Sequence, residues 1–188
     1  QKEEKIQHYI NNIQDSALKM RDVIANTLLR IRNDNYLQSV FINMTDVFQS
    51  QLNLIQTSTV ILKEVTFECQ FAHDLPKFWG VYSDFTQIID NLLTNALDAV
   101  ELKKEKVITV STFFDANFIG FSVADNGYGM SEETKLRLFE PLYTTKSAEK
   151  GTGIGLASVR ELLDNYHAEI LVESKLHEGA KFTIKMPR

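Results

Sequence analysis

Glycine is concentrated in one part of the chain. Of its eight glycines, five fall between residues 127 and 155, namely Gly127, Gly129, Gly151, Gly153 and Gly155. Glycine is used where the backbone must adopt a positive φ or approach a ligand closely. The run at 151–155 (GTGIG) leads directly into a predicted helix, whose free N–H groups and dipole suit a phosphate group. An ordinary tight turn would explain this run equally well if it stood alone.

The surroundings of this run exclude two common nucleotide motifs. A dinucleotide-binding fingerprint follows a strand within a βαβ unit. Here a polar stretch, 147–150 (SAEK), comes first. The P-loop pattern is also absent. A nucleotide bound at these glycines would therefore be held by another arrangement.

Asp125 ends a predicted strand and begins the motif at 125–130 (DNGYGM). A carboxylate in this place can accept a hydrogen bond from an exocyclic amine. Gly127 and Gly129 leave room beside it for a flat base. The alternative interpretation is an ordinary turn between a strand and a loop.

Asn91 and Asn95 lie four residues apart in a predicted helix, 83–103, for which Ser83 is a plausible N-cap. Residues at i and i+4 share one helix face. A neutral amide oxygen suits Mg²⁺, because this cation keeps most of its waters and relies on substrate phosphates. A lone asparagine in a helix is usually only exposed, so it is the pair that indicates a site.

The remaining pattern predicts an α+β fold. Strands are expected at 39–43, 65–71, 78–82, 107–114, 118–124, 168–174 and 180–186, and further helices at 45–56 and 153–166. Hairpins dominate the connections. This combination is typical of a sandwich with helices on one face of a mainly antiparallel sheet.

The N-terminal part carries a nearly heptad apolar stripe, comprising Ile6, Ile10, Ile13, Ala17, Met20, Ile24, Leu28 and Ile31. A helix of about 28 residues would be roughly 42 Å long, more than a small domain covers. A dimerising coiled coil or four-helix bundle is therefore expected, and an amphipathic helix folded back on its own domain is the alternative. The polar residues 32–35 (RNDN) suggest two domains, 1–34 and 35–188.

Composition narrows the functional classes. The chain has 188 residues, 44% of them hydrophobic, which is enough for one well-cored domain. A net charge of -5 without a basic run argues against nucleic-acid binding. Cys69 is the only cysteine, so no internal disulfide can form. No apolar stretch reaches the roughly 18 residues of a membrane span, so no membrane contact is expected for this piece.

Four segments together resemble the histidine kinase and Hsp90-type ATPase superfamily. Residues 91–99 (NLLTNALDA) resemble its N box, 125–130 its G1 box, 139–146 (FEPLYTTK) the F box of histidine kinases, and 151–156 (GTGIGL) the G2 box. The order and spacing of these four segments resemble those of the family over residues 83–166. A weaker resemblance to the whole catalytic domain extends over residues 37–186. The resemblance implies a Bergerat-type two-layer sandwich with a mixed, mainly antiparallel sheet, preceded by a long N-terminal helix.

The resemblance also implies roles for individual residues. Asn95 would coordinate the Mg²⁺ that bridges the ATP phosphates, with Asn91 beside it, and Asp125 would bind the adenine amino group. Residues 128–150 would form a mobile lid that Phe139 orders. The residues that would contact ATP are Asp125, Gly127, Gly129, Phe139, Lys146, Gly151, Thr152, Gly153, Gly155 and Leu156.

Position 91 favours a kinase over a hydrolase. The related ATPases have a glutamate four residues before the Mg²⁺ asparagine, and Asn91 is a poor general base. Asp90 is adjacent, but one helical step turns it about 100° away. The chain departs from many sensor kinases at Asp98, where a basic residue is common; the form here looks closer to nitrogen-regulator-type kinases. The alternatives to a histidine kinase are a hydrolytic ATPase, a protein-serine kinase, and a nucleotide-binding interaction module without catalysis.

The phosphoaccepting histidine is expected upstream of Gln1. His8 superficially resembles an H-box histidine, but Tyr9 follows it where an acidic residue is usual. The roughly 25 residues up to Arg32 suffice for one helix, whereas the family has two. His8 as the acceptor is the alternative. His73, His167 and His177 are expected at the surface.

The chain also lacks a starting methionine, so we expect a fragment of a longer cytoplasmic protein whose removed part could include a membrane anchor. Its implied partners are a response regulator receiver domain and a second copy of the chain, joined through the N-terminal helix.

Overall fold

The computed structural model describes residues 38–58, 64–146 and 151–188. The predicted N-terminal helix, the boundary at residue 34 and His8 lie outside the described residues. They therefore stay predictions.

The centre of the described part is a five-stranded sheet with the order β2-β4-β5-β7-β6. Its strands are β2 (Val65–Gln70), β4 (Lys106–Phe114), β5 (Phe118–Asp125), β6 (Glu169–Lys175) and β7 (Gly179–Pro187). The β2–β4 pair is parallel, and the other three pairs are antiparallel. The prediction of a mixed, mainly antiparallel sheet is confirmed.

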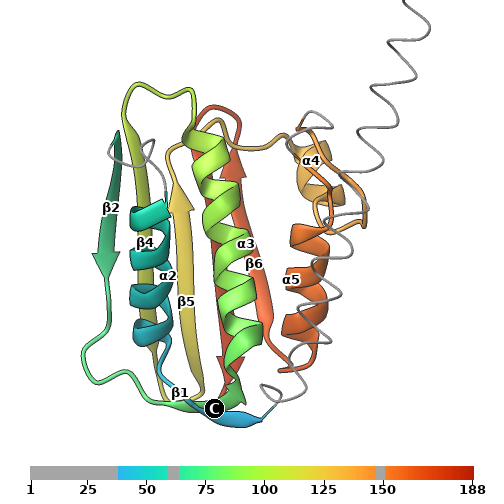
Figure 1. Ribbon diagram of the computed structural model, residues 1–188. Helices are drawn as coiled ribbons and strands as arrows, with labels where there is room; N and C mark the ends of the chain where they lie inside the picture. Colours follow the sequence, from blue (N-terminus) through green and yellow to red (C-terminus); the bar gives the residue numbers. More distant parts are fainter. Residues whose placement is uncertain (1–37, 59–63, 147–150) are drawn as a thin grey trace, which may run out of the picture.

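Three helices cover one face of this sheet: α2 (Met44–Ser58), α3 (Tyr82–Val100) and α5 (Gly155–Asp164) (Figure 1). The helix α3 occupies the middle because one of its faces is entirely apolar, and Phe85, Ile88 and Leu93 on that face are fully buried. Burying one such side chain stabilises the fold by about 1.5–3 kcal/mol.

Alternation along the strands provides the other half of the core. In β5, Ile119, Phe121 and Val123 point toward the helices and are almost completely buried. The intervening Ser122 faces the opposite side, where its hydroxyl lies 2.7 Å from that of Ser111 on β4. A sheet that is apolar on one face and polar on the other is expected when only one face is covered.

Three small elements complete the described part of the fold. The strands β1 (Ser39–Ile42) and β3 (Phe78–Val81) form a separate antiparallel pair. The short helix α4 (Glu132–Arg137) was not predicted. Ser131 caps it by accepting a hydrogen bond from the Thr134 N–H at 3.2 Å.

Two predicted helix starts differ from the structure. The helix α3 begins at Tyr82 directly after β3, with Val81 as its cap residue, so Ser83 is not its N-cap. The hydroxyl of Tyr166 accepts a hydrogen bond from the Val81 N–H at 3.1 Å and thus satisfies a backbone group at this start. The helix α5 begins at Gly155 and not at Gly153, because Gly153 has φ +67, which is not helical.

Candidate nucleotide-binding site

A cavity of about 540 Å³ lies between α3, the end of β5, and the glycine-rich segments that follow it. This volume is typical of a small-molecule site. All four sequence motifs contribute to its lining. Of the predicted site residues, those that line it are Asn91, Asn95, Asp125, Gly129, Lys146, Gly151, Thr152, Gly153, Gly155 and Leu156.

Two predicted site residues are not part of this lining. Gly127 lies behind it, where an added Cβ would come within 2.6 Å of the Ala99 carbonyl oxygen on α3. Its role is therefore close packing of the loop against the helix. Phe139 is half-buried and packs against the hydrophobic core.

Asp125 stands at one end of the cavity, at the carboxyl end of β5. Its Oδ1 accepts a hydrogen bond from the Gly127 N–H at 2.8 Å. Burial raises the pKa of this carboxyl, while hydrogen bonds from the backbone of Gly127 and Ala180 and the charge of Lys103 oppose the rise. A half-buried carboxylate of this kind gains from a further donor, such as an exocyclic amine.

The loop after Asp125 is fastened on two sides. The Asn126 side chain accepts from the Val107 N–H and donates to the Glu105 carbonyl, both at 3.0 Å. On the other side, the Met130 N–H donates to Ser174 Oγ at 2.9 Å. Ser174 belongs to the β6–β7 hairpin, which therefore supports this end of the cavity.

Gly129 can hold its place only because it has no side chain. Its φ is +63, and an added Cβ would come within 2.1 Å of the Lys175 carbonyl oxygen. Every L residue would therefore be strained and would collide with the hairpin backbone.

The opposite end of the cavity contains the two asparagines and the start of α5. An added Cβ on Gly155 would come within 2.9 Å of Asn91 Oδ1, so the N-terminus of α5 approaches α3 closely. The free N–H groups at such a helix start suit an anion. Asn91 and Asn95 thus lie on the α3 face that borders the glycine run, as the helical spacing predicts.

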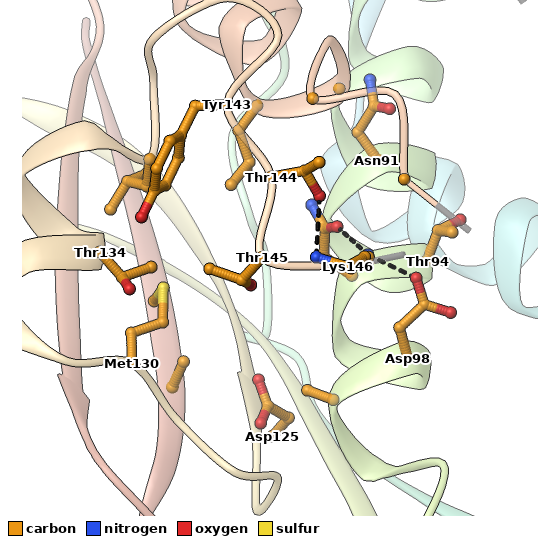
Figure 2. A pocket seen from close by; sticks show the side chains of 18 of the residues that line it. Asn91, Thr94, Asp98, Asp125, Met130, Thr134, Tyr143, Thr144, Thr145 and Lys146 are labelled. Atoms are coloured by element: carbon orange, nitrogen blue, oxygen red, sulfur yellow. Dashed lines mark hydrogen bonds and ion pairs between the residues drawn. The ribbon is translucent and has the colours of Figure 1, made fainter. Parts of the chain in front are cut away.

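Lys146 joins these groups. Its Nζ donates to Asn95 Oδ1 at 2.8 Å and to Asp98 Oδ2 at 2.5 Å. Figure 2 shows the side chains of Lys146 and Asp98 pointing toward each other within the cavity. The predicted phosphate-binding lysine is therefore paired with the predicted metal-binding asparagine.

Sequence reasoning missed several lining residues, including Thr94, Asp98 and Met130. Thr94 and Asp98 could have been found, because positions 91, 94, 95 and 98 form one stripe of a helix. Asp90 also belongs to the lining, so the expectation that helical rotation turns it away from the site is wrong. Burial raises the pKa of the Asp90 carboxyl.

The side-chain oxygens at this end of the cavity suit a divalent cation that is also bound by the phosphates of its substrate. Within the described residues, no group of three or more His, Cys, Asp and Glu side chains could hold a metal ion. A Mg²⁺ ion needs only one or two protein oxygens when it is also bound by phosphates and water. Asn95 Oδ1, which binds the Lys146 ammonium, is an oxygen of this kind and would hold the cation.

The described part is an α+β sandwich with a cavity of ligand-binding size beside α3. Residues 80–188 match the family described as histidine kinase-, DNA gyrase B-, and HSP90-like ATPase. The chain belongs to this family, and its described part has the fold of a histidine kinase catalytic domain.

Several relatives with similar sequences are named as kinases. Sporulation kinase E of Bacillus subtilis is 27% identical over 176 residues, which are 94% of this chain and 23% of the relative. Sporulation kinase B of the same organism is 30% identical over 147 residues, 76% of this chain and 33% of the relative. The chain thus spans a quarter to a third of these two relatives.

Solved structures share the fold. The catalytic domain of histidine kinase ThkA, in a nucleotide-free form, has a TM-score of 0.69 at 23% identity, covering 80% of this chain and 97% of that one. Full-length ShkA in complex with AMPPNP has a TM-score of 0.67 at 24% identity, covering 80% of this chain and 31% of that one.

Among the described residues, no helix is both long and apolar enough to cross a membrane.

Proposed function

We propose that this chain binds Mg-ATP in the cavity and transfers its γ-phosphoryl group to a histidine of the intact protein, for relay to the receiver domain of a response regulator. One observation carries the proposal: all four motif segments border a single cavity, with an amide at position 91. The names of the relatives, among them two sporulation kinases, support the same activity.

The cavity divides into a base end and a phosphate end. At the base end, Asp125 accepts the adenine amino group, and Gly129 keeps the loop clear of the ring. At the phosphate end, Asn95 binds the metal, with Asn91 beside it, while Lys146, Thr152 and the glycines of the 151–155 run contact phosphate oxygens. Magnesium supplies charge neutralisation when it is bound. Such roles suit phosphoryl transfer, in which catalysis is mostly positioning and electrostatics.

Three further proposals concern the intact protein. The phosphoaccepting histidine lies upstream of this fragment, and the N-terminal stripe from Ile6 to Ile31 joins two copies in a homodimer. The catalytic part works in the cytoplasm, where ATP and the receiver domain are available.

A second function, ATP hydrolysis, is favoured by one observation. Asp90 borders the same cavity, and burial raises the pKa of its carboxyl, which improves it as a proton acceptor for water. Turnover without a histidine acceptor that is lost in Asp90→Asn would identify hydrolysis. Labelled phosphate from ATP that is incorporated only when a histidine acceptor is added, and that is lost in acid, would identify a histidine kinase.

The test uses Asp125→Asn and Asn95→Ala, with Asn117→Ala as the control. Asn117 is an exposed asparagine in the β4–β5 turn, at the end of β5 away from Asp125. Loss of the charge-assisted hydrogen bond in Asp125→Asn is expected to weaken ATP binding by about 10- to 100-fold. Asn95→Ala is expected to retain weak, metal-independent ATP binding and to lose phosphoryl transfer.

Calorimetry measures ATP binding. Phosphoryl transfer is measured with γ-labelled ATP and, as the acceptor, a longer form of the protein that contains the phosphoaccepting histidine. The control should match the unaltered chain in both assays. Unchanged ATP affinity in Asp125→Asn, or normal transfer in Asn95→Ala, would contradict the proposal.

A further inference from the structure

Two side-chain oxygens of α3 converge on one cation. Asn95 Oδ1 and Asp98 Oδ2 accept hydrogen bonds from the same ammonium group, that of Lys146, at 2.8 and 2.5 Å. The two residues are three positions apart, so their side chains are neighbours on the helix surface. The lysine comes from a segment 48 residues further along the chain.

We propose that Asn95 and Asp98 together form a divalent-cation site that Lys146 fills in the absence of metal. This inference rests on the proposed function and adds Asp98 as a second protein ligand for the metal. Binding of a metal–nucleotide complex then exchanges one cation for another. Lys146 leaves the two oxygens and turns to the phosphates.

The chemistry of the two donors fits a hard divalent cation. One is a neutral amide oxygen and the other a carboxylate, and Mg²⁺ in nucleotide sites commonly combines one or two carboxylates with phosphates and water. An ammonium group is a compact point charge with rotatable donors, so it can occupy such a position without matching a fixed geometry.

The exposure of the pair permits the exchange. The side chains of Lys146 and Asp98 are 31% and 36% exposed. Separating them therefore strands neither charge in an apolar interior, and the cost of breaking an ion pair at this exposure is small.

The exchange has a consequence for the order of binding. Without a cation, the Asp98 carboxylate would repel the phosphates of an incoming nucleotide. With Lys146 in place, the site is neutralised but the lysine is unavailable to the phosphates. A nucleotide that brings its own divalent cation solves both problems, so Asp98 makes the site selective for metal-bound nucleotide.

The opposing explanation is that Asp98 only anchors Lys146. In that case Asp98 acts through the lysine, and removing the lysine should remove every effect of Asp98. A double-mutant cycle with Asp98→Asn and Lys146→Met separates the two explanations. Asp164→Asn is the control, because it removes an exposed carboxylate that is likewise ion-paired, with Arg160 at 3.3 Å.

The measurement is Mn²⁺ binding by electron paramagnetic resonance, with a non-hydrolysable ATP analogue at saturating concentration for each variant. Asp98→Asn is expected to weaken Mn²⁺ binding by about 10- to 100-fold, both alone and in the Lys146→Met background. Lys146→Met alone is expected to strengthen Mn²⁺ binding, since the competing cation is gone, and to weaken metal-free binding of the analogue.

Two outcomes would overturn the inference: unchanged Mn²⁺ affinity in Asp98→Asn, or a loss that disappears in the Lys146→Met background. Asp98→Ala provides a second variant if Asp98→Asn does not fold. Asn95→Ala is measured in parallel for Mn²⁺ binding, and Asp125→Asn for its affinity for the analogue. If neither variant has an effect, the proposed function fails; if both show the expected losses, only the role of Asp98 fails.

Discussion

The two glycine-bearing regions that border the cavity are held in different ways. The base-side loop, residues 125–130, is fastened to β4 by the Asn126 side chain and to the β6–β7 hairpin by Ser174. The phosphate-side segment comprises residues 139–146 and 151–155. Leu142 pairs with the Gly153 carbonyl within this segment, and Lys146 links it to α3.

The difference lies in what would have to move for each region to change position. The base-side loop is continuous with the sheet, so moving it means breaking strand-end hydrogen bonds and shifting a hairpin. The part of the phosphate-side segment that carries Lys146 meets α3 through an ion pair that is about one-third exposed and is worth little in stability. One end of the site is therefore preformed, and the other can rearrange around its ligand at low cost.

The largest expected effect comes from Gly129→Ala. The positive φ of +63 alone costs an alanine about 1–3 kcal/mol. The new Cβ would also lie 2.1 Å from the Lys175 carbonyl oxygen, so the hairpin would have to shift. We expect loss of measurable ATP binding and a free energy of unfolding reduced by at least this amount, as measured by calorimetry and denaturant titration.

Gly151→Ala in the phosphate-side segment is the matched control. An added Cβ there would meet Thr144 Oγ1 at 2.6 Å, which can rotate aside, and Lys146 Cβ at 2.9 Å, which can move only together with the backbone of the phosphate-side segment. We expect the free energy of unfolding to change by less than about 0.5 kcal/mol. Equal destabilisation by the two alanines would contradict the contrast between a preformed and an adaptable end.

Local sequence patterns predicted most of the individual elements. Alternation placed β4 at 107–114, and the structure has Lys106–Phe114. Apolar spacing placed α3 within a few residues of its observed ends. The short helix α4 was missed, because its six residues bury no side chain and so carry no periodic apolar signal.

Contacts between distant residues could not be predicted in the same way. The strand order and the parallel β2–β4 pairing depend on how hairpins dock, not on any one strand. At Asp98 the sequence indicates only a departure from a basic residue, because nothing near this position reveals its partner 48 residues away. The predicted surface position of three histidines is confirmed, because His73, His167 and His177 are all exposed.

A smaller effect is expected from Ser174→Ala. Ser174 Oγ accepts from the Met130 N–H at 2.9 Å and donates to the Gly179 carbonyl at 2.8 Å, and both contacts are partly buried. Their loss is expected to lower the free energy of unfolding by about 1–3 kcal/mol. ATP affinity should also fall several-fold, since Met130 borders the cavity.

Ser122→Ala distinguishes this effect from a general loss of sheet stability. Ser122 also makes a partly buried hydrogen bond, to Ser111 on the face of the sheet away from the helices. Its removal should lower stability and leave ATP affinity unchanged. If Ser174→Ala behaves in the same way, the hairpin stabilises the fold without positioning the base-side loop.

The smallest expected effect is the pH dependence contributed by Asp125. Burial raises the pKa of this carboxyl in the unliganded fold above its ordinary value of 3.8. The folded protein therefore binds a proton more readily than the unfolded chain does. Its stability relative to Asp125→Asn should fall as the pH rises from the unfolded pKa through the raised folded pKa.

ATP affinity should follow the opposite trend. In the proposed function the adenine amino group donates to the ionised carboxylate, so bound nucleotide would lower the pKa of Asp125 and binding would release a proton. Affinity should therefore fall, by less than about tenfold, as the pH decreases from neutrality through the raised pKa of Asp125 in the unliganded protein. Calorimetric titration at each pH measures the ATP affinity. Asp125→Asn is the control for the titration of adenine itself, because that titration affects both proteins equally. Parallel pH profiles for the two proteins would show that Asp125 does not accept the base.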